Sequence, residues 1–179
     1  MNTKQENETI QSVLNGDREK FALLVDKYKG PVYNLVYRLT GSGHDAEDLA
    51  QETFIRAFRS LNRFKTNKKF FPWLYTIALN LTRNHLKKKK PVLVEDFDHL
   101  QTGTNNPEQV VAKLQEAEAL ARHIQRLPVS LREAIILRYY HYLRFEEISQ
   151  ILCISLSAVK MRVYRGLEKL EILMTKNSQ

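Results

Sequence analysis

Apolar residues recur at helical spacing along almost the whole of this 179-residue sequence. They stand at positions 70, 73, 74, 77 and 81, for example, which is the stripe of an amphipathic helix. Strand-like alternation of apolar and polar residues is nearly absent, and the chain has 6 glycines. The fold class that this pattern predicts is all-α.

Breaks in the periodicity divide the first part of the chain into helices. Asp17 is a suitable N-cap, and Gly30-Pro31 predicts the end of the helix that follows it. A second helix begins at the proline, which suits a first turn. A third begins near Asp45, which we expect to cap it, and Phe58 belongs to its buried stripe.

The positive charge of the chain is concentrated in its first half. The formal net charge is +8, and residues 1–90 carry 17 basic and 9 acidic side chains. Residues 91–179 carry 11 of each. Such an excess favours a polyanionic partner, and nucleic acid is the most common one.

The stretch from Arg63 to Lys90 combines basic charge with aromatic rings. It holds nine Lys or Arg residues, no Asp or Glu, and the one tryptophan of the chain. Cations neutralise phosphates, and ring faces stack on unpaired bases, each stack being worth about 1–3 kcal/mol. This composition is typical of a surface that binds single-stranded nucleic acid.

Part of the same stretch must instead supply a core. The side chains that we expect to point inward are Trp73, Leu74, Ile77 and Leu81. The side chains that we expect to lie mainly off this stripe, free to meet a ligand, are Phe64, Tyr75, Asn80, Arg83, Asn84 and Lys87.

The helix that begins near Asp45 has an acidic and polar face, which composition alone explains in more than one way. Such a face is commonly just solvated, or compensates the helix dipole. It could also bind a partner or a metal ion. The metal reading is weak, because no histidine or cysteine array supports it and helical phasing scatters the carboxylates.

Beyond Lys90 the composition changes. Residues 91–112 contain four acidic residues, no Lys or Arg, two prolines and a polar TGTNN run. We interpret them as a flexible acidic linker between a domain at 1–90 and a second domain at 113–179.

Several functional classes are excluded or disfavoured. A single cysteine excludes an intramolecular disulfide and a multi-cysteine zinc site, and it fits a reducing cytoplasm. No run of about 18 apolar residues exists, so we expect no membrane insertion. The N-terminus is polar and does not resemble a signal peptide. We expect a cytoplasmic protein without a cofactor or a metal ion.

The second domain begins with an amphipathic helix that ends at Pro128, and the apolar stripe of this helix is Ala117, Leu120, Ala121, Ile124 and Leu127. Ser130 to Glu133 has the pattern of a capping box, which predicts a helix start. The helix after it is apolar over much of its circumference, so we expect it to be the centre of a small bundle. His141 within it is expected to be a partly exposed surface group rather than a ligand.

The second half of this domain predicts a helix-turn-helix. Residues 145–152 make a short helix, and Cys153 and Ile154 make a tight turn. Ser155 is a suitable N-cap for a second helix, whose exposed side is basic. Such a second helix commonly enters the major groove of DNA. The positions that we expect to face inward on it are Val159, Val163, Gly166, Leu167 and Leu170.

Four motifs together resemble the extracytoplasmic-function (ECF) sigma factors of the sigma-70 family, the small two-domain subunits of bacterial RNA polymerase. In order, they are GDREKFALLVDKY (16–28), DAEDLAQETFIRAF (45–58), FPWLYTIALNLTRN (71–84) and FEEISQIL…ISLSAVKMRVYRG (145–166). The resemblance covers nearly the whole chain. It implies that one protein uses both a single-strand surface and a duplex-reading helix, as the opening of a promoter requires.

The resemblance implies roles for the first domain. The DAEDLAQE helix of such proteins docks on the β′ coiled coil of the core enzyme, which implies core binding by Asp48, Gln51, Glu52 and Ile55. The next helix and the loop before it recognise the minus-ten element, holding a flipped base in a pocket. The implied minus-ten residues are Phe64, Lys69, Tyr75, Asn80, Arg83, Asn84 and Lys87.

For the second domain the resemblance implies recognition of the minus-thirty-five element in the major groove. Arginine can read guanine with two hydrogen bonds, whereas the cap and some flanking side chains contact phosphate. The implied residues are Ser155, Lys160, Met161, Arg162, Tyr164 and Arg165.

Three positions depart from the family pattern. Cys153 stands where glycine is frequent, and a left-handed non-glycine residue there costs about 1 kcal/mol. We expect its thiol to be half-buried and inert. Met161 replaces a small polar residue, so the minus-thirty-five preference is open. Arg144 replaces a frequent serine N-cap, which predicts a less firm helix start.

The function that the sequence predicts is that of an alternative RNA polymerase sigma factor, without an active site of its own. Its implied partners are the core enzyme, promoter DNA in duplex and single-stranded form, and an anti-sigma factor. A free-standing helix-turn-helix regulator is the alternative within DNA binding. A magnesium-dependent nuclease-like enzyme using Asp45 to Glu52 is the alternative from another class, and it lacks a second carboxylate cluster.

Overall fold

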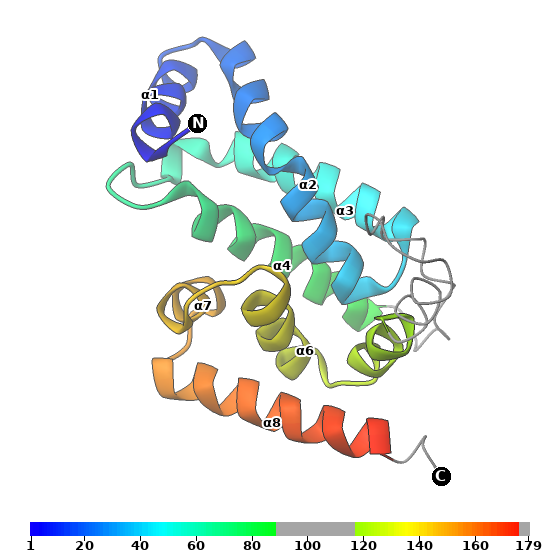
Figure 1. Cartoon of the computed structure of the whole chain (residues 1–179). Coiled ribbons are helices and arrows are strands. Elements are labelled where there is room, and N and C mark those ends of the chain that lie inside the picture. The colour runs from blue at the N-terminus through cyan, green and yellow to red at the C-terminus, as the bar shows by residue number, and fades with distance from the viewer. Residues whose placement is uncertain (89–116, 176–179) are drawn as a thin grey trace, which may run out of the picture.

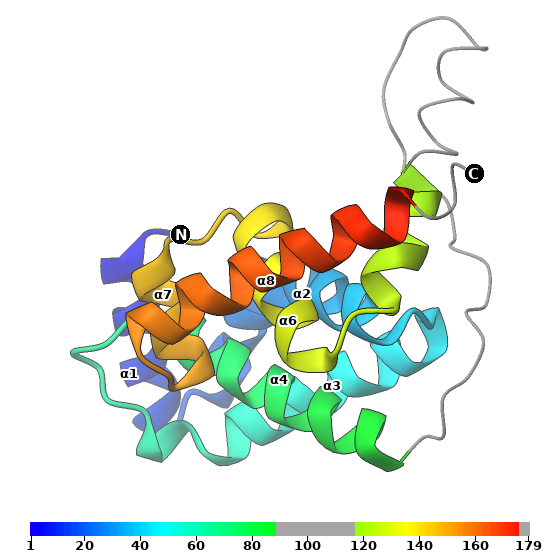
Figure 2. The same cartoon turned by 90° about the horizontal axis from the view of Figure 1, so that it is seen from below.

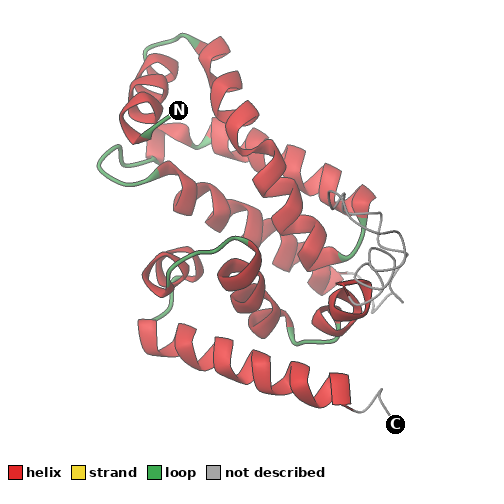
Figure 3. Ribbon diagram, in the orientation of Figure 1, coloured by secondary structure: helices red, strands yellow, loops and turns green. Residues whose placement is uncertain are grey.

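The structure is a computed structural model that describes residues 1–88 and 117–175. Every regular element in these residues is helical, which confirms the all-α class (Figure 3). In chain order (Figure 1) the elements are α1 (Thr3–Leu14), η1 (Arg18–Lys20), α2 (Phe21–Thr40), α3 (Gly43–Arg59), η2 (Leu61–Arg63), α4 (Phe70–Lys88), a helix at 117–125, α6 (Val129–Ile135), η3 (Ile136–Tyr140), α7 (Phe145–Leu152) and α8 (Leu156–Thr175). The predicted linker at 91–112 lies outside the described residues.

The first domain is a bundle in which α2, α3 and α4 pack on one another and α1 lies against the start of α2. Its core combines small and branched side chains such as Leu24 and Ala46 with aromatic ones such as Phe70, and all three of these are fully buried. The expected break at Gly30-Pro31 is wrong, because α2 continues through Pro31 to Thr40. Burial on both sides of the proline, at Tyr28 and Val32, offsets the cost of about 3 kcal/mol that an interior proline carries.

The helix α1 was not anticipated from its polar sequence. Asn2 caps it, since its side chain accepts a hydrogen bond from the backbone of Gln5 at 3.0 Å. Its buried Glu6 accepts a hydrogen bond from the hydroxyl of Tyr28 at 2.5 Å and pairs with Lys27. One buried carboxylate therefore fastens α1 to α2.

The second domain packs α8 across α6 at very short range. A Cβ atom on Gly166 would lie 2.8 Å from Cγ1 of Ile135, so this crossing requires glycine. The inward positions expected on α8 are confirmed except for Leu167, which is 37% exposed. After α6 the chain forms a turn of π-helix, η3, in place of the single long helix that we expected.

The short helix, the turn and the second helix expected near the C-terminus are all present as α7, Cys153 and α8. Cys153 has φ of 54° and is therefore left-handed. Its side chain is exposed, so the expected half-burial is wrong. Ser155 caps α8 as expected, because its hydroxyl accepts a hydrogen bond from the backbone of Ala158 at 3.2 Å. At the start of α7 the backbone of Arg144 donates to Glu147.

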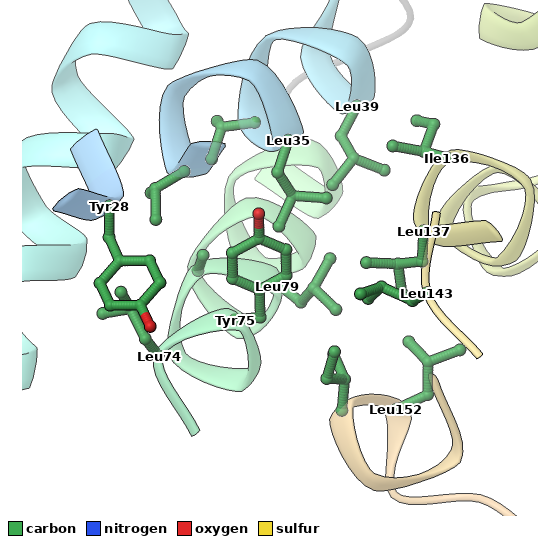
Figure 4. Packing of buried hydrophobic residues seen from close by; sticks show 14 of the residues in the cluster. Tyr28, Leu35, Leu39, Leu74, Tyr75, Leu79, Ile136, Leu137, Leu143 and Leu152 are labelled. Atoms are coloured by element: carbon green, nitrogen blue, oxygen red, sulfur yellow. The ribbon is translucent and has the colours of Figure 1, made fainter. Parts of the chain in front are cut away.

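The two domains share one hydrophobic core. Figures 1 and 2 show the second domain lying against α4 and the carboxyl end of α2. Figure 4 shows leucines of α2 and Tyr75 and Leu79 of α4 facing the second domain. The side chains that they meet are Ile136, Leu137, Leu143 and Leu152. Since all of these are buried, the apolar surface that each domain would otherwise expose is covered by the other.

The capping box expected at Ser130 is wrong. The helix α6 begins at Val129, immediately after Pro128, and that end has no side-chain cap. Glu133, the residue that should have completed the box, instead reaches the first domain.

Candidate nucleic-acid interface

The turn before α4 places the ring of Phe64 inside the protein. After η2 the backbone becomes extended at Phe64, which turns the ring under the first turn of α4. There it lies 5.6 Å from the ring of Phe70 and 5.3 Å from that of Trp73, and it is 6% exposed. The expectation that Phe64 is free to meet a ligand is wrong for this arrangement.

Tyr75 is also buried, contrary to the same expectation. It is 0% exposed, and its hydroxyl lies 3.0 Å from Nδ1 of His141 in the second domain. Burial raises the pKa of Tyr75, so its hydroxyl stays neutral. Burial also lowers the pKa of His141 to about 4, with a smaller contribution from the nearby Arg38. His141 is thus a contact between domains rather than a surface group.

The inward side of α4 otherwise follows the expected stripe. Leu74 and Leu81 are buried, and Trp73 and Ile77 are half-buried against the core. The outer side presents Asn80, Asn84 and Lys87, which are exposed as expected.

Arg83 stands on the outer side of α4 but is held by the second domain. Its Nε donates to Oε1 of Glu133 at 2.6 Å, and its Nη2 donates to Oε2 at 2.8 Å. The hydrogen bonds to Glu133 raise the pKa of Arg83, more than burial lowers it. Nη1 of Arg83 also donates to Oδ1 of Asn80 at 3.3 Å. Lys69 lies 3.5 Å from Glu147 of α7.

The helix α8 presents its basic side to solvent. Tyr164 is 65% exposed and Met161 is 52% exposed. Ser155, Lys160 and Arg165 are exposed as well, whereas Arg162 is half-buried. The side chains on this surface are of the kinds that contact base edges and phosphates in a major groove.

The acidic and polar face of α3 borders a hollow of about 380 Å³, which His85 of α4 also lines. Gln51, Asp48 and Ile55 are exposed there, and Glu52 pairs with Arg56 at 2.6 Å.

Phe58, expected in the core, is 36% exposed and packs edge-on against Phe21.

Asp45 does not cap α3 as predicted. The cap is Ser42, whose hydroxyl accepts a hydrogen bond from the backbone of Asp45 at 3.3 Å. The carboxylate of Asp45 is buried and lies 3.3 Å from Nε2 of His85 on α4. Within residues 1–88 and 117–175, no group of three His, Cys, Asp or Glu side chains is arranged to hold a metal ion.

Sequence reasoning missed the contacts that join the domains. Besides Glu133 and Glu147, they include Thr76, whose hydroxyl donates to the carbonyl of Ile151 at 3.1 Å. Arg132 is buried and donates to the carbonyl of Leu39 at the end of α2. Burial lowers the pKa of Arg132 to about 10. Only the largely apolar circumference of the helix that the sequence predicts after Ser130 could have indicated such burial.

Comparison with known proteins identifies both halves. Residues 24–92 match the family model for sigma-70 region 2, and residues 117–170 match that for sigma-70 region 4. The ECF RNA polymerase sigma factor SigW of Bacillus subtilis is 40% identical over 90% of this chain and 92% of its own length. This chain belongs to the ECF sigma factors of the sigma-70 family. It is therefore a transcription initiation factor.

A second relative agrees with this sigma-factor assignment, and two solved structures share the fold. The RNA polymerase sigma-H factor of Pseudomonas aeruginosa is 32% identical over 94% of this chain and 93% of its own length. CnrH, solved with the cytosolic domain of CnrY, has the same fold with a TM-score of 0.71 at 23% identity, over 95% of this chain and 97% of that one. RpoE of Bartonella quintana, solved with the anti-sigma factor NepR, has the same fold with a TM-score of 0.71 at 20% identity. The match covers 88% of this chain and 98% of that one. In the described residues of this sigma factor, no helix is long and apolar enough to cross a membrane.

Proposed function

We propose that this sigma factor divides promoter recognition between its domains, the first domain (1–90) binding core polymerase and the minus-ten element, and the second (113–179) binding the minus-thirty-five element. The observation that carries the proposal is the outward display of polar and charged side chains on three separate helices, α3, α4 and α8, each at a position where the family motifs match. In this scheme the sigma factor has no active site of its own, because it contributes by binding polymerase and promoter DNA.

Core polymerase would dock on α3. The exposed Asp48, Gln51 and Ile55, with Glu52 beside them, combine carboxylates, an amide and an apolar contact around one hollow. Such a surface suits the basic side of a partner helix, and the β′ coiled coil is the partner that the family resemblance implies. This use of the acidic face replaces the solvated and metal-binding interpretations.

The minus-ten element would be held by α4 and the turn before it. Asn80, Asn84 and Lys87 are exposed, and Arg83 is next to Asn80. Amides can bond to the edges of an unpaired base, while the cations neutralise the flanking phosphates. Phe64, Lys69 and Tyr75 would join them once they are released from their present contacts.

The minus-thirty-five element would be read by α8 as the second helix of a helix-turn-helix. Lys160, Met161, Tyr164 and Arg165 point outward on it, and Ser155 stands at its N-terminus, where backbone N–H groups favour a phosphate. Arg162 is less exposed and would contact the phosphate backbone.

An anti-sigma factor is the proposed regulator. Support comes from RpoE of Bartonella quintana, which has this fold and was solved bound to the anti-sigma factor NepR. A partner that occupies the surfaces of both domains should compete with core polymerase. Simultaneous binding of the inhibitor and core polymerase to this chain would contradict that occlusion.

Promoter-dependent transcription tests the whole proposal. The protein and bacterial core polymerase would be mixed with a pooled library of upstream regions, and the starts mapped. We expect specific starts that disappear with Gln51→Ala/Glu52→Ala and persist with Glu8→Ala/Gln11→Ala, a matched pair of exposed residues on α1. Salt-sensitive binding to duplex DNA without any starts would favour the free-standing regulator instead.

A further inference from the structure

We propose that a hollow between α2, α4 and η3 binds a small anion that carries a flat ring, of the size and kind of a nucleoside monophosphate. The hollow has a volume of about 390 Å³. This volume lies within the range of about 300–1,000 Å³ that is usual for small-molecule sites. Apart from Tyr75, none of the side chains that line it is assigned to polymerase or to DNA, so the inference goes beyond the proposed function.

The permanent charge in this hollow is positive. The guanidinium carbon of Arg38 lies 3.7 Å from the centre of the Tyr140 ring, and the side chain of Arg38 is half-buried. Of the residues that the structure describes, no Asp or Glu lines the hollow and none pairs with Arg38. Burial lowers the pKa of Arg38, because the cation has lost part of its hydration. The hollow therefore holds a partly dehydrated cation that lacks a counter-ion.

Neither contact of Arg38 supplies that counter-charge. The residue stands in the last turn of α2, where the partial negative charge of the helix end favours a cation. The ring of Tyr140 interacts with one face of the guanidinium. The N–H groups lie in the guanidinium plane, and within residues 1–88 and 117–175 they donate to no other group. Their fork suits two oxygens of a phosphate or a carboxylate.

A second polar group at the hollow lacks a partner. Nε2 of His141 is buried and makes no hydrogen bond to any described residue. Nδ1 of the same ring lies 3.0 Å from the hydroxyl of Tyr75. When that hydroxyl donates, the neutral ring carries its proton on Nε2. A buried donor without an acceptor is costly, and an oxygen of a bound anion would remove that cost.

The other walls of the hollow suit a flat ring with a polar edge. Phe71 of α4 is half-buried, and its ring centre lies 4.1 Å from that of Tyr75. Asn34 of α2 is exposed, and its amide both donates and accepts, as the edge of a nucleobase requires. A nucleoside monophosphate offers a phosphate for Arg38, a ring for Phe71 and an edge for Asn34.

The backbone that presents Tyr140 and His141 is irregular. The segment η3 is a turn of π-helix, and such turns are frequent at functional sites. Just beyond it, Tyr142 is left-handed with φ of 53°, which is strained for a bulky residue. Strain of this kind persists where the surrounding structure needs a side chain in one place. This irregularity is independent of the charge in the hollow and points to the same site.

Calorimetric titration of the full chain tests the site, with the 5′-monophosphates of adenosine, guanosine, cytidine and uridine in separate runs. We expect binding of at least one of them, and Arg38→Gln should weaken it about tenfold or more, because the phosphate loses charge-assisted hydrogen bonds. Arg59→Gln removes the same charge from an exposed position on α3 and should leave the affinity unchanged. Failure of all four to bind the wild type, or equal affinities of the two variants, would overturn the proposal.

Two fragments of the ligand test its class. The matching nucleoside lacks the phosphate and inorganic phosphate lacks the ring, so each should bind at least about tenfold more weakly than the nucleotide. Inorganic phosphate that binds as tightly as the nucleotide would overturn the assignment of a ring to the hollow.

Asn34→Ala keeps the test decisive if Arg38→Gln does not fold, since Asn34 is exposed and its loss leaves the stack of Arg38 on Tyr140 intact. We expect this variant to bind the nucleotide about fivefold more weakly, the effect of one lost hydrogen bond, and to bind inorganic phosphate as the wild type does. Unchanged affinity for the nucleotide would overturn the site. These outcomes are independent of the transcription assay, because Asn34 and Arg38 lie outside the surfaces assigned to polymerase and DNA.

Discussion

The helices α4 and α8 are both basic and amphipathic, yet the protein treats their polar sides differently. On α8 the outward side chains Met161 and Tyr164 are 52% and 65% exposed. On α4 the comparable cation, Arg83, is bonded to Glu133 of the other domain. The surface assigned to duplex DNA is thus open, and the one assigned to single-stranded DNA is engaged.

This difference follows the order of events at a promoter. A duplex-reading helix that is always available can find a minus-thirty-five element before any strand separation. A single-strand surface that is open all the time would also bind unrelated nucleic acid, because stacking and phosphate neutralisation depend little on sequence.

The largest difference expected between the helices concerns their leucines. Leu79 of α4 is fully buried, and it faces the second domain in Figure 4, whereas Leu167 of α8 is 37% exposed. Leu79→Ala should lower the free energy of unfolding by about 2–5 kcal/mol, because it leaves a cavity in the shared core. Leu167→Ala should cost below about 1 kcal/mol. Chemical denaturation measures both, and equal losses would contradict a core that extends between the domains.

Substitutions on α8 and on α4 should affect different steps, duplex binding and open-complex formation respectively. Arg165→Ala should weaken binding to a duplex minus-thirty-five fragment by about 1–3 kcal/mol, as expected where an arginine reads a base. Asn80→Ala should leave that binding nearly intact and reduce open-complex formation by about 0.5–1.5 kcal/mol, the worth of a hydrogen bond. Gel-shift and permanganate-footprinting assays measure the two. Equal loss of both activities in either variant would contradict the division of labour between α4 and α8.

The turn before α8 carries strain that a small change relieves. Cys153 is left-handed with φ of 54°, a conformation that glycine adopts without a steric penalty. Cys153→Gly should stabilise the protein by about 0.5–1 kcal/mol, after allowing for the greater freedom of glycine in the unfolded chain. Cys153→Ala retains the strain and serves as the control. A Cys153→Gly protein less stable than the alanine variant would show that the left-handed conformation costs less than the added freedom of glycine in the unfolded chain.

A smaller effect on the α4 side should depend on pH. The pKa of His141 is lowered to about 4 by burial and by Arg38, while its partner Tyr75 stays neutral. Since the unfolded state binds the proton more readily, this contribution to stability is present above the ordinary pKa near 6.5 and is lost as the pH falls toward 4. His141→Gln should therefore flatten the fall in melting temperature between pH 7 and pH 5. If the melting temperature of the His141→Gln variant falls as steeply as that of the wild type, groups other than His141 cause the fall.

The sequence was sufficient for the helices and for most of their inner faces, because periodicity reports directly on which side of a helix is apolar. Val159, Val163 and Leu170 of α8 lie where their spacing placed them. The same reasoning failed at Gly30-Pro31, where burial on either side outweighs the local preference of proline. It also failed at Leu167, since periodicity does not tell how far a neighbouring helix extends.

The contacts between domains could not be predicted in this way. Ser130 to Glu133 satisfies the local rule for a capping box, but Glu133 finds a stronger partner in Arg83, 50 residues away in the chain. Tyr75 was expected off the buried stripe of its helix and His141 at the surface, because the periodicity of one helix carries no information on the other domain. Local patterns identify the surfaces that can bind, and tertiary packing decides which of them are free.

Distance measurement in the free and the engaged protein tests the central claim most directly. Spin labels would be placed at Asn62→Cys, exposed on η2, and at Tyr142→Cys, which is 84% exposed, in a Cys153→Ser background. Pulsed electron paramagnetic resonance should give one short distance between the labels in the free protein, matching this structure. A longer distance is expected with core polymerase and promoter DNA. The same short distance in that complex would contradict the separation of the domains on which minus-ten recognition is proposed to depend.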